Sequence, residues 1–538
     1  MNLSRALKWA QPILWCAATI PFNSACAGED GRNIAHHGGR QAAALACVSC
    51  HGIDGGGNAA AGFPRLAGLN AVYLRRRLRA FSEGTDSNPV MAGVAKALTA
   101  GEIEAVTRYF AGLVPVSHSK APEGVSRVAG AALAEYGDWP GRGLPACNQC
   151  HGPGGLGVGE SFPPLAGQPS AYIANQIAAW KSGRRSGGPL GLMRQVAERL
   201  QDAELKSVAA YYAGLPVTGP SGAHPESADA ATAQVASGGA GGLTSTARAG
   251  QGGPTGLFQP PNRSAYPHGP FGEKVREGEA IFRHTPDHPL AGRYVGNRQS
   301  CENCHLDAGR LANSAPMWAS WVAYPAYRKK NGRVNTMGQR IQGCFTYSMD
   351  AQASQAGKAP ALDSEPMVSL LSYLSWLATG APSGDRRMAG RGYPRLAETT
   401  PGFEPSRGAA VYARKCALCH GRNGEGQMAG GVVVFPPLWG RGAYSWGAGM
   451  HKVDVAAGYI KYNMPLGLAD PVKTQGYLSD QDAWDVAAFM DAHPRPQDPR
   501  FRGSLRETTD RFHQSRYDYY GKLRAADGRL LGQDPPER

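Results

Sequence analysis

The pattern Cys-x-x-Cys-His occurs four times in the 538 residues of this chain. With 11 cysteines and 14 histidines in the sequence, chance alone would give about 0.006 such matches. Two thiols at this spacing can form thioethers to a porphyrin, and the adjacent histidine can then bind its iron. A structural zinc knuckle is the alternative, but zinc needs four ligands and tolerates many spacings, whereas the histidine here is always the next residue. The sequence therefore predicts four covalently bound haem c groups.

The residues of the four motifs fall into two sets. The predicted thioether cysteines are Cys47, Cys50, Cys147, Cys150, Cys301, Cys304, Cys416 and Cys419. The predicted histidine ligands of the four irons are His51, His151, His305 and His420.

Residues 1–27 have the features of a secretory signal. Arg5 and Lys8 precede an apolar run over residues 9–20, and the small-residue site Ala25-Cys26-Ala27 follows. We expect cleavage near Ala27 and export to the periplasm, since haem c is assembled in an oxidising compartment outside the cytoplasm. The apolar run is too short to cross a bilayer and no later stretch is long enough, so we expect no membrane span in the mature chain. Export also excludes nucleic acid as a partner.

The cysteine count leaves one thiol without a role. Cys16 and Cys26 lie in the signal and eight cysteines belong to the haem motifs, so Cys344 remains. The net charge of the whole chain is +14. Removal of two signal bases and addition of eight haem propionates would reduce it to about +4, so the total charge is a weak argument for an anionic partner.

Helical segments recur around each haem motif and predict an all-α fold of four cytochrome c-type domains. A short amphipathic segment precedes each motif, and a helix rich in aromatic residues follows it. The preceding segments are 39–46, 130–136, 278–282 and 408–412, and the later helices are 99–109, 203–215, 364–377 and 479–490. Thr99 with Glu102, and Ser479 with Asp482, are typical of capping boxes at helix starts.

Composition divides these modules into two dihaem halves. Residues 217–262 are rich in Gly, Ala, Ser and Pro without an apolar period, which predicts a flexible linker. The predicted domains are domain I (28–125), domain II (126–216), the catalytic domain III (263–395) and domain IV (396–500). Residues 501–538 form a charged C-terminal tail that either wraps around the protein or hangs loose.

Three haems have a methionine at a similar distance after the motif. Met91, Met193 and Met464 lie 40, 42 and 44 residues after the histidine of their motif, and a Met ligand is typical of electron-transfer haems. A methionine is more often core filler, so the shared spacing carries this prediction.

The third haem has two competing ligands. Cys344 lies 39 residues after His305, whereas Met349 lies 44 residues after it, at the same offset as Met464. Spacing alone slightly favours Met349, but an unpaired cysteine in an exported protein needs a role, which iron ligation or redox chemistry would supply. An inert buried cysteine is the third possibility.

Basic residues cluster just before Cys344. They are Arg328, Lys329, Lys330, Arg333 and Arg340. Such a run is usually a solvated surface, but beside a haem with an unusual ligand it could bind a small dianion and keep a thiolate deprotonated. Guanidinium groups suit oxyanions, so Arg340, the base closest in sequence to the cysteine, is the first candidate.

The C-terminal half, about 263–500, resembles the dihaem thiosulfate dehydrogenases, which form tetrathionate. The motifs that carry the resemblance lie at 301–310, 324–335, 340–349, 435–440 and 447–451. The resemblance implies His305 and Cys344 as ligands of the third haem and Met464 as a ligand of the fourth. Some members have Lys before that Met and exchange ligands on reduction, but this chain has Asn463 there.

The N-terminal half, about 30–216, looks like a dihaem cytochrome of the c4 type. Residues 63–68 and 162–167 are similar sequences that follow the first two haem motifs. A cytochrome of this type often accepts electrons from the enzyme family above, which implies an acceptor fused to its enzyme.

The resemblance implies a reaction at Cys344. We expect the thiol to leave the iron and bond the outer sulfur of one thiosulfate, which a second thiosulfate then attacks to give tetrathionate. Arg340, Arg328 and Lys330 are expected to hold the dianions. Electrons would pass through the fourth haem to the N-terminal pair and then to a soluble or membrane-bound acceptor. The alternatives are a tetrathionate reductase, a non-catalytic electron-transfer cytochrome and a dihaem peroxidase, which needs a vacant iron site.

Overall fold

A computed structural model describes residues 26–217 and 256–533. Most of the predicted signal and most of the predicted linker therefore lie outside the described residues. The all-α prediction is confirmed: helices form each domain, and the strands of the described residues make two short antiparallel hairpins. None of the helices formed by the described residues is long and apolar enough to cross a bilayer.

Domains I and II follow the same helix order. Domain I contains α1 (Cys26–His37), α2 (Val48–His51), α3 (Ala71–Glu83), α4 (Pro89–Ala97) and α5 (Ala100–Gly112). Domain II contains α6 (Val128–Tyr136), α7 (Trp139–Arg142), α8 (Asn148–His151), η1 (Pro153–Gly155), α9 (Ser170–Lys181), η2 (Pro189–Gly191), α10 (Leu192–Arg199) and α11 (Asp202–Ala213).

Domains III and IV each add a hairpin. Domain III contains η3 (Arg263–Ala265), α13 (Gly269–Arg283), η4 (Gly292–Tyr294), η5 (Cys301–Asn303), α14 (Leu306–Gly309), α15 (Met317–Ala323), β1 (Ala326–Arg328), β2 (Arg333–Asn335), α16 (Met337–Tyr347), η6 (Ala351–Ala353) and α17 (Glu365–Leu377). Domain IV contains α18 (Pro405–Lys415), α19 (Ala417–His420), β3 (Gln427–Ala429), β4 (Val432–Phe435), η7 (Gly449–His451), α20 (Val453–Asn463) and α21 (Asp480–Asp491), and α22 (Leu505–Phe512) follows.

The first and last helices of every domain cross at a glycine. A Cβ atom on Gly31, Gly130, Gly278 or Gly408 would lie 2.0–2.3 Å from a backbone carbonyl oxygen of the partner helix. The four crossing pairs are α1 with α5, α6 with α11, α13 with α17 and α18 with α21. The backbones approach so closely that no side chain fits, and this shared contact fixes the scaffold on which each haem motif is placed.

The helix before the first haem motif is not where the sequence pattern placed it. Residues 39–46 form turns, and the crossing helix is α1, which ends at His37. The other three predicted segments lie within α6, α13 and α18. The capping box at Thr99 and Glu102 is present, whereas Ser479 caps α21 by accepting from Asp482 N (3.0 Å) without the reciprocal bond.

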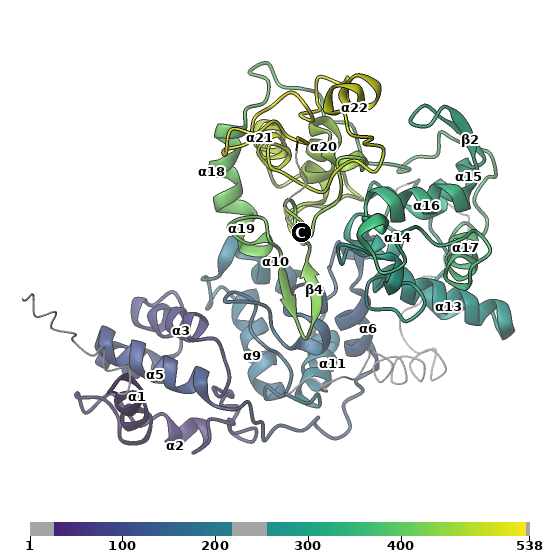
Figure 1. Cartoon of the computed structure of the whole chain (residues 1–538). Helices are drawn as coiled ribbons and strands as arrows, with labels where there is room; N and C mark the ends of the chain where they lie inside the picture. The colour runs from purple at the N-terminus through teal and green to yellow at the C-terminus, as the bar shows by residue number, and fades with distance from the viewer. Residues whose placement is uncertain (1–25, 218–255, 534–538) are drawn as a thin grey trace, which may run out of the picture.

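The C-terminal tail is folded onto domain IV over residues 501–533. Tyr520 and Leu531 pack with Trp446 in a small buried cluster. Figure 1 shows this yellow segment wrapped around the green helices of domain IV. Of the two alternatives for the tail, the structure shows the wrapped one.

Domain II contacts both domains of the other half. Arg283 at the end of α13 forms an ion pair with Glu135 of α6 (Nη2 to Oε1, 2.6 Å). The hairpin β3–β4 projects from domain IV toward domain II (Figure 1), and Phe435 packs on Phe162 with ring centroids 5.1 Å apart. Domain II therefore lies between domain I and the catalytic half.

Candidate functional site

The four motif histidines share one hydrogen-bond arrangement. The Nδ1 atom of each lies 2.7–2.9 Å from a backbone carbonyl oxygen: His51 on Pro64, His151 on Pro163, His305 on Ala315 and His420 on Pro436. A carbonyl can only accept, so Nδ1 carries the proton and donates it. The Nε2 atom of each ring is then left with the lone pair that a metal requires.

Burial keeps these imidazoles neutral. It lowers the pKa of all four histidines below the ordinary value. The effect is largest at His305, where burial, with a smaller contribution from the Arg340 cation, lowers the pKa to about 4. A neutral ring with a fixed tautomer is the form in which histidine binds iron.

A continuous cavity of about 920 Å³ connects three of the haem motifs. Its lining includes Cys150 of domain II, Cys304 of domain III, and Cys419, His420 and Met464 of domain IV. The volume is at the upper end of the range of about 300–1,000 Å³ that is usual for ligand sites. A mostly apolar cavity lined by thiols and a neutral imidazole fits covalently attached haem.

The backbone of the third motif differs from the other three. Cys47, Cys147 and Cys416 precede short α-helical turns, whereas Cys301 opens the 3₁₀ turn η5. Asp307, two residues after His305, has a φ of 52°. A non-glycine residue in the left-handed region is uncommon and marks a local requirement of the third site.

Both candidate ligands of the third haem line the same small cavity. It has a volume of about 60 Å³ and is bounded by Cys301, Cys304, His305, Cys344 and Met349. Met349 is also a member of the buried core of domain III. The structure thus places Cys344 near His305, but it does not favour Cys344 over Met349 as the ligand of the third haem.

Helix α16 places a cation directly on the Cys344 sulfur. Thr336 and Gln339 form a capping box at its start, and the helix then runs through Arg340 and Cys344. Residues four apart share one helix face, and Arg340 Nη1 lies 3.1 Å from Cys344 Sγ. The proximity of Cys344 raises the pKa of Arg340 above its ordinary value. Arg340 is therefore a permanent cation beside the thiol.

Two further cations gather around Tyr347, at the end of the same helix. Lys330 Nζ lies 3.7 Å from the centroid of the Tyr347 ring, and Arg500 Cζ lies 5.5 Å from it. Lys330 also donates to the backbone oxygen of Gly447. Desolvation of its ammonium, Arg500 and Arg340 lower the pKa of Lys330, but solvent screening limits this effect because the residue as a whole is exposed. We call Arg340, Lys330 and Arg500 the cation cluster.

Arg328 is not part of this cluster. It ends strand β1 and has no side-chain hydrogen bond or ion pair with any residue that the structure describes. The neighbouring Tyr327 and Val334 of the hairpin are exposed.

The three predicted methionine ligands lie near the ends of helices. Met91 follows the capping residue Asn88 in the first turn of α4, Met193 lies in the first turn of α10, and Met464 is the C-cap residue that follows α20. Among the described residues that line the large cavity, Met464 is present, whereas Met91 and Met193 are not. The preceding Asn463 is buried, accepts from Ser314 Oγ of domain III and donates to Tyr459 O (3.1 Å). Its side chain is thus committed to an interdomain contact.

Sequence reasoning missed two parts of the site. Arg500 lies 156 residues after Cys344, and no local pattern connects the two. The approach of Cys150 to Cys419 depends on packing between domains II and IV, where Val158, Phe162 and Phe435 form one buried cluster. Aromatic residues follow each haem motif and could have indicated a contact between domains, but the sequence does not show which two of them pack together.

Comparison with protein families supports four cytochrome domains. Residues 293–383 match the SoxA/TsdA cytochrome c domain, and residues 37–113 and 405–493 match cytochrome c. Residues 145–211 match subunit III of the cbb3-type cytochrome c oxidase.

Individual proteins resemble the chain in part or along nearly its whole length. A thiosulfate dehydrogenase of Stutzerimonas stutzeri is 47% identical over 54% of this chain and 89% of its own length. A thiosulfate dehydrogenase electron acceptor of Thiomonas intermedia is 44% identical over 40% of this chain and 88% of its own. The solved structure of a thiosulfate dehydrogenase (TsdBA) from Marichromatium purpuratum is 50% identical, with a TM-score of 0.83, and covers 94% of this chain and 99% of that one.

Proposed function

The chain belongs to the thiosulfate dehydrogenase family, in the form that carries its electron-acceptor cytochrome on the same chain, and from this premise we propose that it couples two thiosulfates to tetrathionate at Cys344. His305 and Cys344 would hold the iron of the third haem, and His420 and Met464 that of the fourth. His51 with Met91, and His151 with Met193, would hold the two haems of the acceptor half. The predicted signal and the haem motifs support a periplasmic location for the reaction.

The observation that carries this proposal is the contact between Arg340 and Cys344 in the third haem site. Arg340 Nη1 lies 3.1 Å from the sulfur, and that sulfur lines the cavity of His305. A cation at this distance offsets the negative charge that the sulfur carries when it acts as a nucleophile or departs as a leaving group. An inert core cysteine would not need a half-buried guanidinium beside it.

The chemistry balances in two steps at Cys344. In the first, the thiolate forms a bond to the outer sulfur of one thiosulfate dianion, which gives a monoanionic S-sulfanyl-sulfonate on the cysteine and releases two electrons. In the second, another thiosulfate attacks the sulfur that was added, so tetrathionate leaves with two negative charges and the cysteine leaves as a thiolate. The second step is thiol–disulfide exchange in type.

The cation cluster opposes the repulsion between the two substrates. Two dianions and a thiolate cannot approach one another in a partly desolvated site without compensating positive charge. Arg340 contacts the sulfur, and Lys330 and Arg500 flank Tyr347 three residues further along α16. Arg328, next to the turn of the β1–β2 hairpin, remains a fourth candidate on sequence grounds.

The interdomain packing supports a route for the electrons. Bound haem supplies one-electron acceptors, so two adjacent haems suit a two-electron oxidation. The large cavity is lined by Cys304 of domain III, Cys419 of domain IV and Cys150 of domain II. We propose that electrons follow this order from domain III to domain IV and then to domain II, and that domain I passes them to a soluble or membrane-bound acceptor. A carrier fused in this position favours oxidation over tetrathionate reduction, and a redox titration of the four haems tests that direction.

Substitution of the thiol tests the proposal. Cys344→Gly should abolish thiosulfate oxidation with ferricyanide as acceptor while the protein keeps four haems. Met349→Leu is the matched control, because Met349 lines the same cavity. It should retain activity and the haem spectrum. An active Cys344→Gly variant, or loss of activity with Met349→Leu alone, would contradict the proposal.

A further inference from the structure

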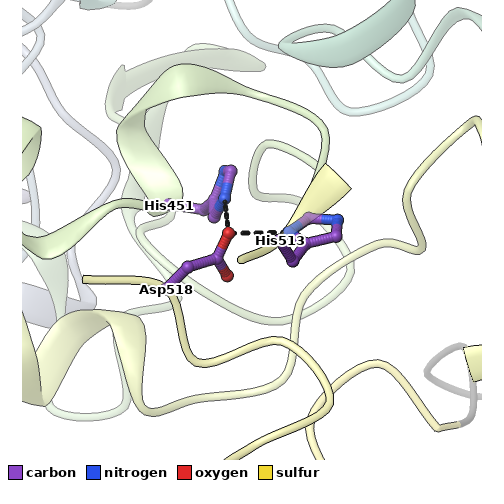
Figure 2. Close-up of side chains that lie close together, drawn as sticks. All are labelled: His451, His513 and Asp518. Carbon is purple, nitrogen blue, oxygen red and sulfur yellow. Dashed lines mark hydrogen bonds and ion pairs between the residues drawn. The ribbon is translucent and has the colours of Figure 1, made fainter. Parts of the chain in front are cut away.

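Two histidines and one aspartate converge in the core between domain IV and the C-terminal tail. His451 ends η7, whereas His513 and Asp518 belong to the tail segment that follows α22. Figure 2 shows the three side chains directed toward one point. They are 3%, 0% and 1% exposed, respectively, so none of them is available to substrate.

One carboxylate oxygen lies between the two rings. Asp518 Oδ2 is 2.8 Å from His451 Nε2 and 2.8 Å from His513 Nδ1. A ligand atom from each of the three residues lies within 4.8 Å of the others. Two imidazole nitrogens and a carboxylate oxygen are ligands that zinc and similar divalent cations take.

The remote nitrogen of each ring is oriented by an acceptor. His513 Nε2 lies 2.9 Å from Asp498 Oδ2, and His451 Nδ1 contacts the backbone oxygen of Ala448. A ring that donates its remote N–H to a carboxylate or a carbonyl turns its other lone pair toward the metal. This arrangement is found in metal-binding histidines, and it is repeated at both rings here.

We propose that His451, His513 and Asp518 bind a divalent transition metal ion of the zinc class in a structural site. Zinc–nitrogen bonds of about 2.0–2.1 Å in a tetrahedron place ligand atoms roughly 3.3 Å apart, so the 2.8 Å contacts would open by about 0.5 Å when the ion binds. The fourth tetrahedral position would hold a water.

Charge balance in the core is compatible with the ion. Both rings direct one nitrogen at the same carboxylate oxygen, and their other nitrogens face Asp498 and the Ala448 carbonyl. A divalent cation between the three ligand atoms would accept a lone pair from each ring, and the Asp518 carboxylate would offset part of its charge.

The ion would fix the tail in a position that also supports the cation cluster. It joins residue 451 to residues 513 and 518 and so closes a long loop, and ligand binding of this kind stabilises the folded state directly. Asp498, which orients His513, also accepts from Arg500 Nε (2.9 Å). The metal would take no part in the thiosulfate reaction, so its presence can be measured independently of activity.

Metal analysis of the full-length holoprotein tests the site. Protein produced in zinc-supplemented medium and purified without chelators should contain one zinc atom for every four haem irons. A crystal of this protein should show an anomalous difference peak at the zinc edge between the three side chains. Dipicolinate should remove the zinc and lower the Tm, and zinc chloride should restore both. Protein that holds four irons but no stoichiometric zinc, before and after incubation with zinc chloride, would overturn the site and leave a hydrogen-bonded cluster without a metal in its place.

Variants locate the metal within the chain. Asp518→Asn and His451→Gln should each lose the zinc while keeping four irons. His493→Gln is the control, because this half-buried histidine of domain IV bonds the Phe489 carbonyl (2.7 Å) and no carboxylate of the residues that the structure describes. It should retain the zinc. Zinc that persists in Asp518→Asn, or a peak elsewhere in the crystal, would equally contradict the assignment.

Discussion

At the scale of single residues, the pair Arg340 and Cys344 has the most direct consequence for activity. Charged hydrogen bonds contribute about 1.5–3 kcal/mol, which corresponds to roughly a 10- to 100-fold change in rate. We therefore expect Arg340→Gln to lower kcat/KM for thiosulfate by about that factor, and Arg340→Lys to recover only part of it because the planar fork is lost. Steady-state kinetics measures the effect. Lys329→Gln, at an exposed residue in the turn of the β1–β2 hairpin and outside the cation cluster, should leave kcat/KM unchanged. An equal loss there would show a general effect of charge.

Lys330 should make substrate binding depend on pH. Its pKa is lowered by desolvation and by Arg500 and Arg340. A lysine with a lowered pKa is charged at low pH and loses its proton at a pH below the ordinary lysine pKa of about 10.4. Because a neutral Lys330 no longer attracts the dianion, the KM for thiosulfate should rise as the pH increases above neutrality. Lys330→Arg remains charged throughout and should flatten the profile of KM against pH. An unchanged profile in that variant would assign the titration to another group.

The ligand choice at the third haem shows what residues alone can predict. The four Cys-x-x-Cys-His motifs predicted their attachment sites from spacing, because the chemistry is local. Cys344 and Met349 could not be separated in the same way, because both follow His305 at a suitable distance and both line its cavity. The family resemblance, rather than geometry, favours the thiol.

At the scale of helices, the glycine crossings should be sensitive to a single methyl group. Gly31→Ala would place a Cβ atom 2.3 Å from the Ala105 carbonyl oxygen. Overpacking of this kind costs about 1–3 kcal/mol, so thermal unfolding should occur at a lower Tm. Gly101→Ala, on the partner helix α5 where no atom lies within 4 Å, should be neutral or stabilising. Equal Tm values for the two variants would show that the crossing is not tight.

The helices themselves were predictable where the apolar period was long. The four late helices were located by their period, and two of them also by a cap; the helix predicted over residues 99–109 corresponds to α5, whose N-cap is Thr99. The first crossing helix was misplaced because the connection from that helix to its haem motif varies in length among the domains. It is absent between Lys415 and Cys416 but extends from residue 38 to residue 46 in domain I. Connection length is set by tertiary packing, which one sequence does not display.

At the scale of the whole molecule, the ion pair between Glu135 and Arg283 joins the two halves. Burial raises the pKa of Glu135, but Arg283, His284 and the hydrogen bond from Asn148 together outweigh burial and lower the pKa to about 2. A lowered carboxyl pKa contributes stability above the unfolded value of about 4.3, and this contribution is lost as the pH falls toward 2. Glu135→Gln should therefore lower the Tm at pH 7, by an amount that corresponds to about 2 kcal/mol, and the difference from the unsubstituted protein should vanish between pH 4 and pH 2. A difference in Tm that stays constant over this range would contradict the assigned charge pair.

The arrangement of the four domains was beyond the reach of the sequence. Contacts such as Glu135 with Arg283, or Phe162 with Phe435, join residues that are more than a hundred positions apart. No local period or motif encodes such pairs, and a flexible linker, as predicted between the halves, does not determine how the halves are arranged. The fused acceptor was predicted from family resemblance, and its placement beside Cys419 came from the structure.

An electron paramagnetic resonance spectrum of the oxidised holoprotein tests the central claim most directly. The account predicts a low-spin signal with thiolate ligation from one haem in four, which disappears in Cys344→Gly and persists in Met349→Leu. A spectrum with no thiolate-ligated haem, or a thiolate signal that survives the loss of Cys344, would contradict it.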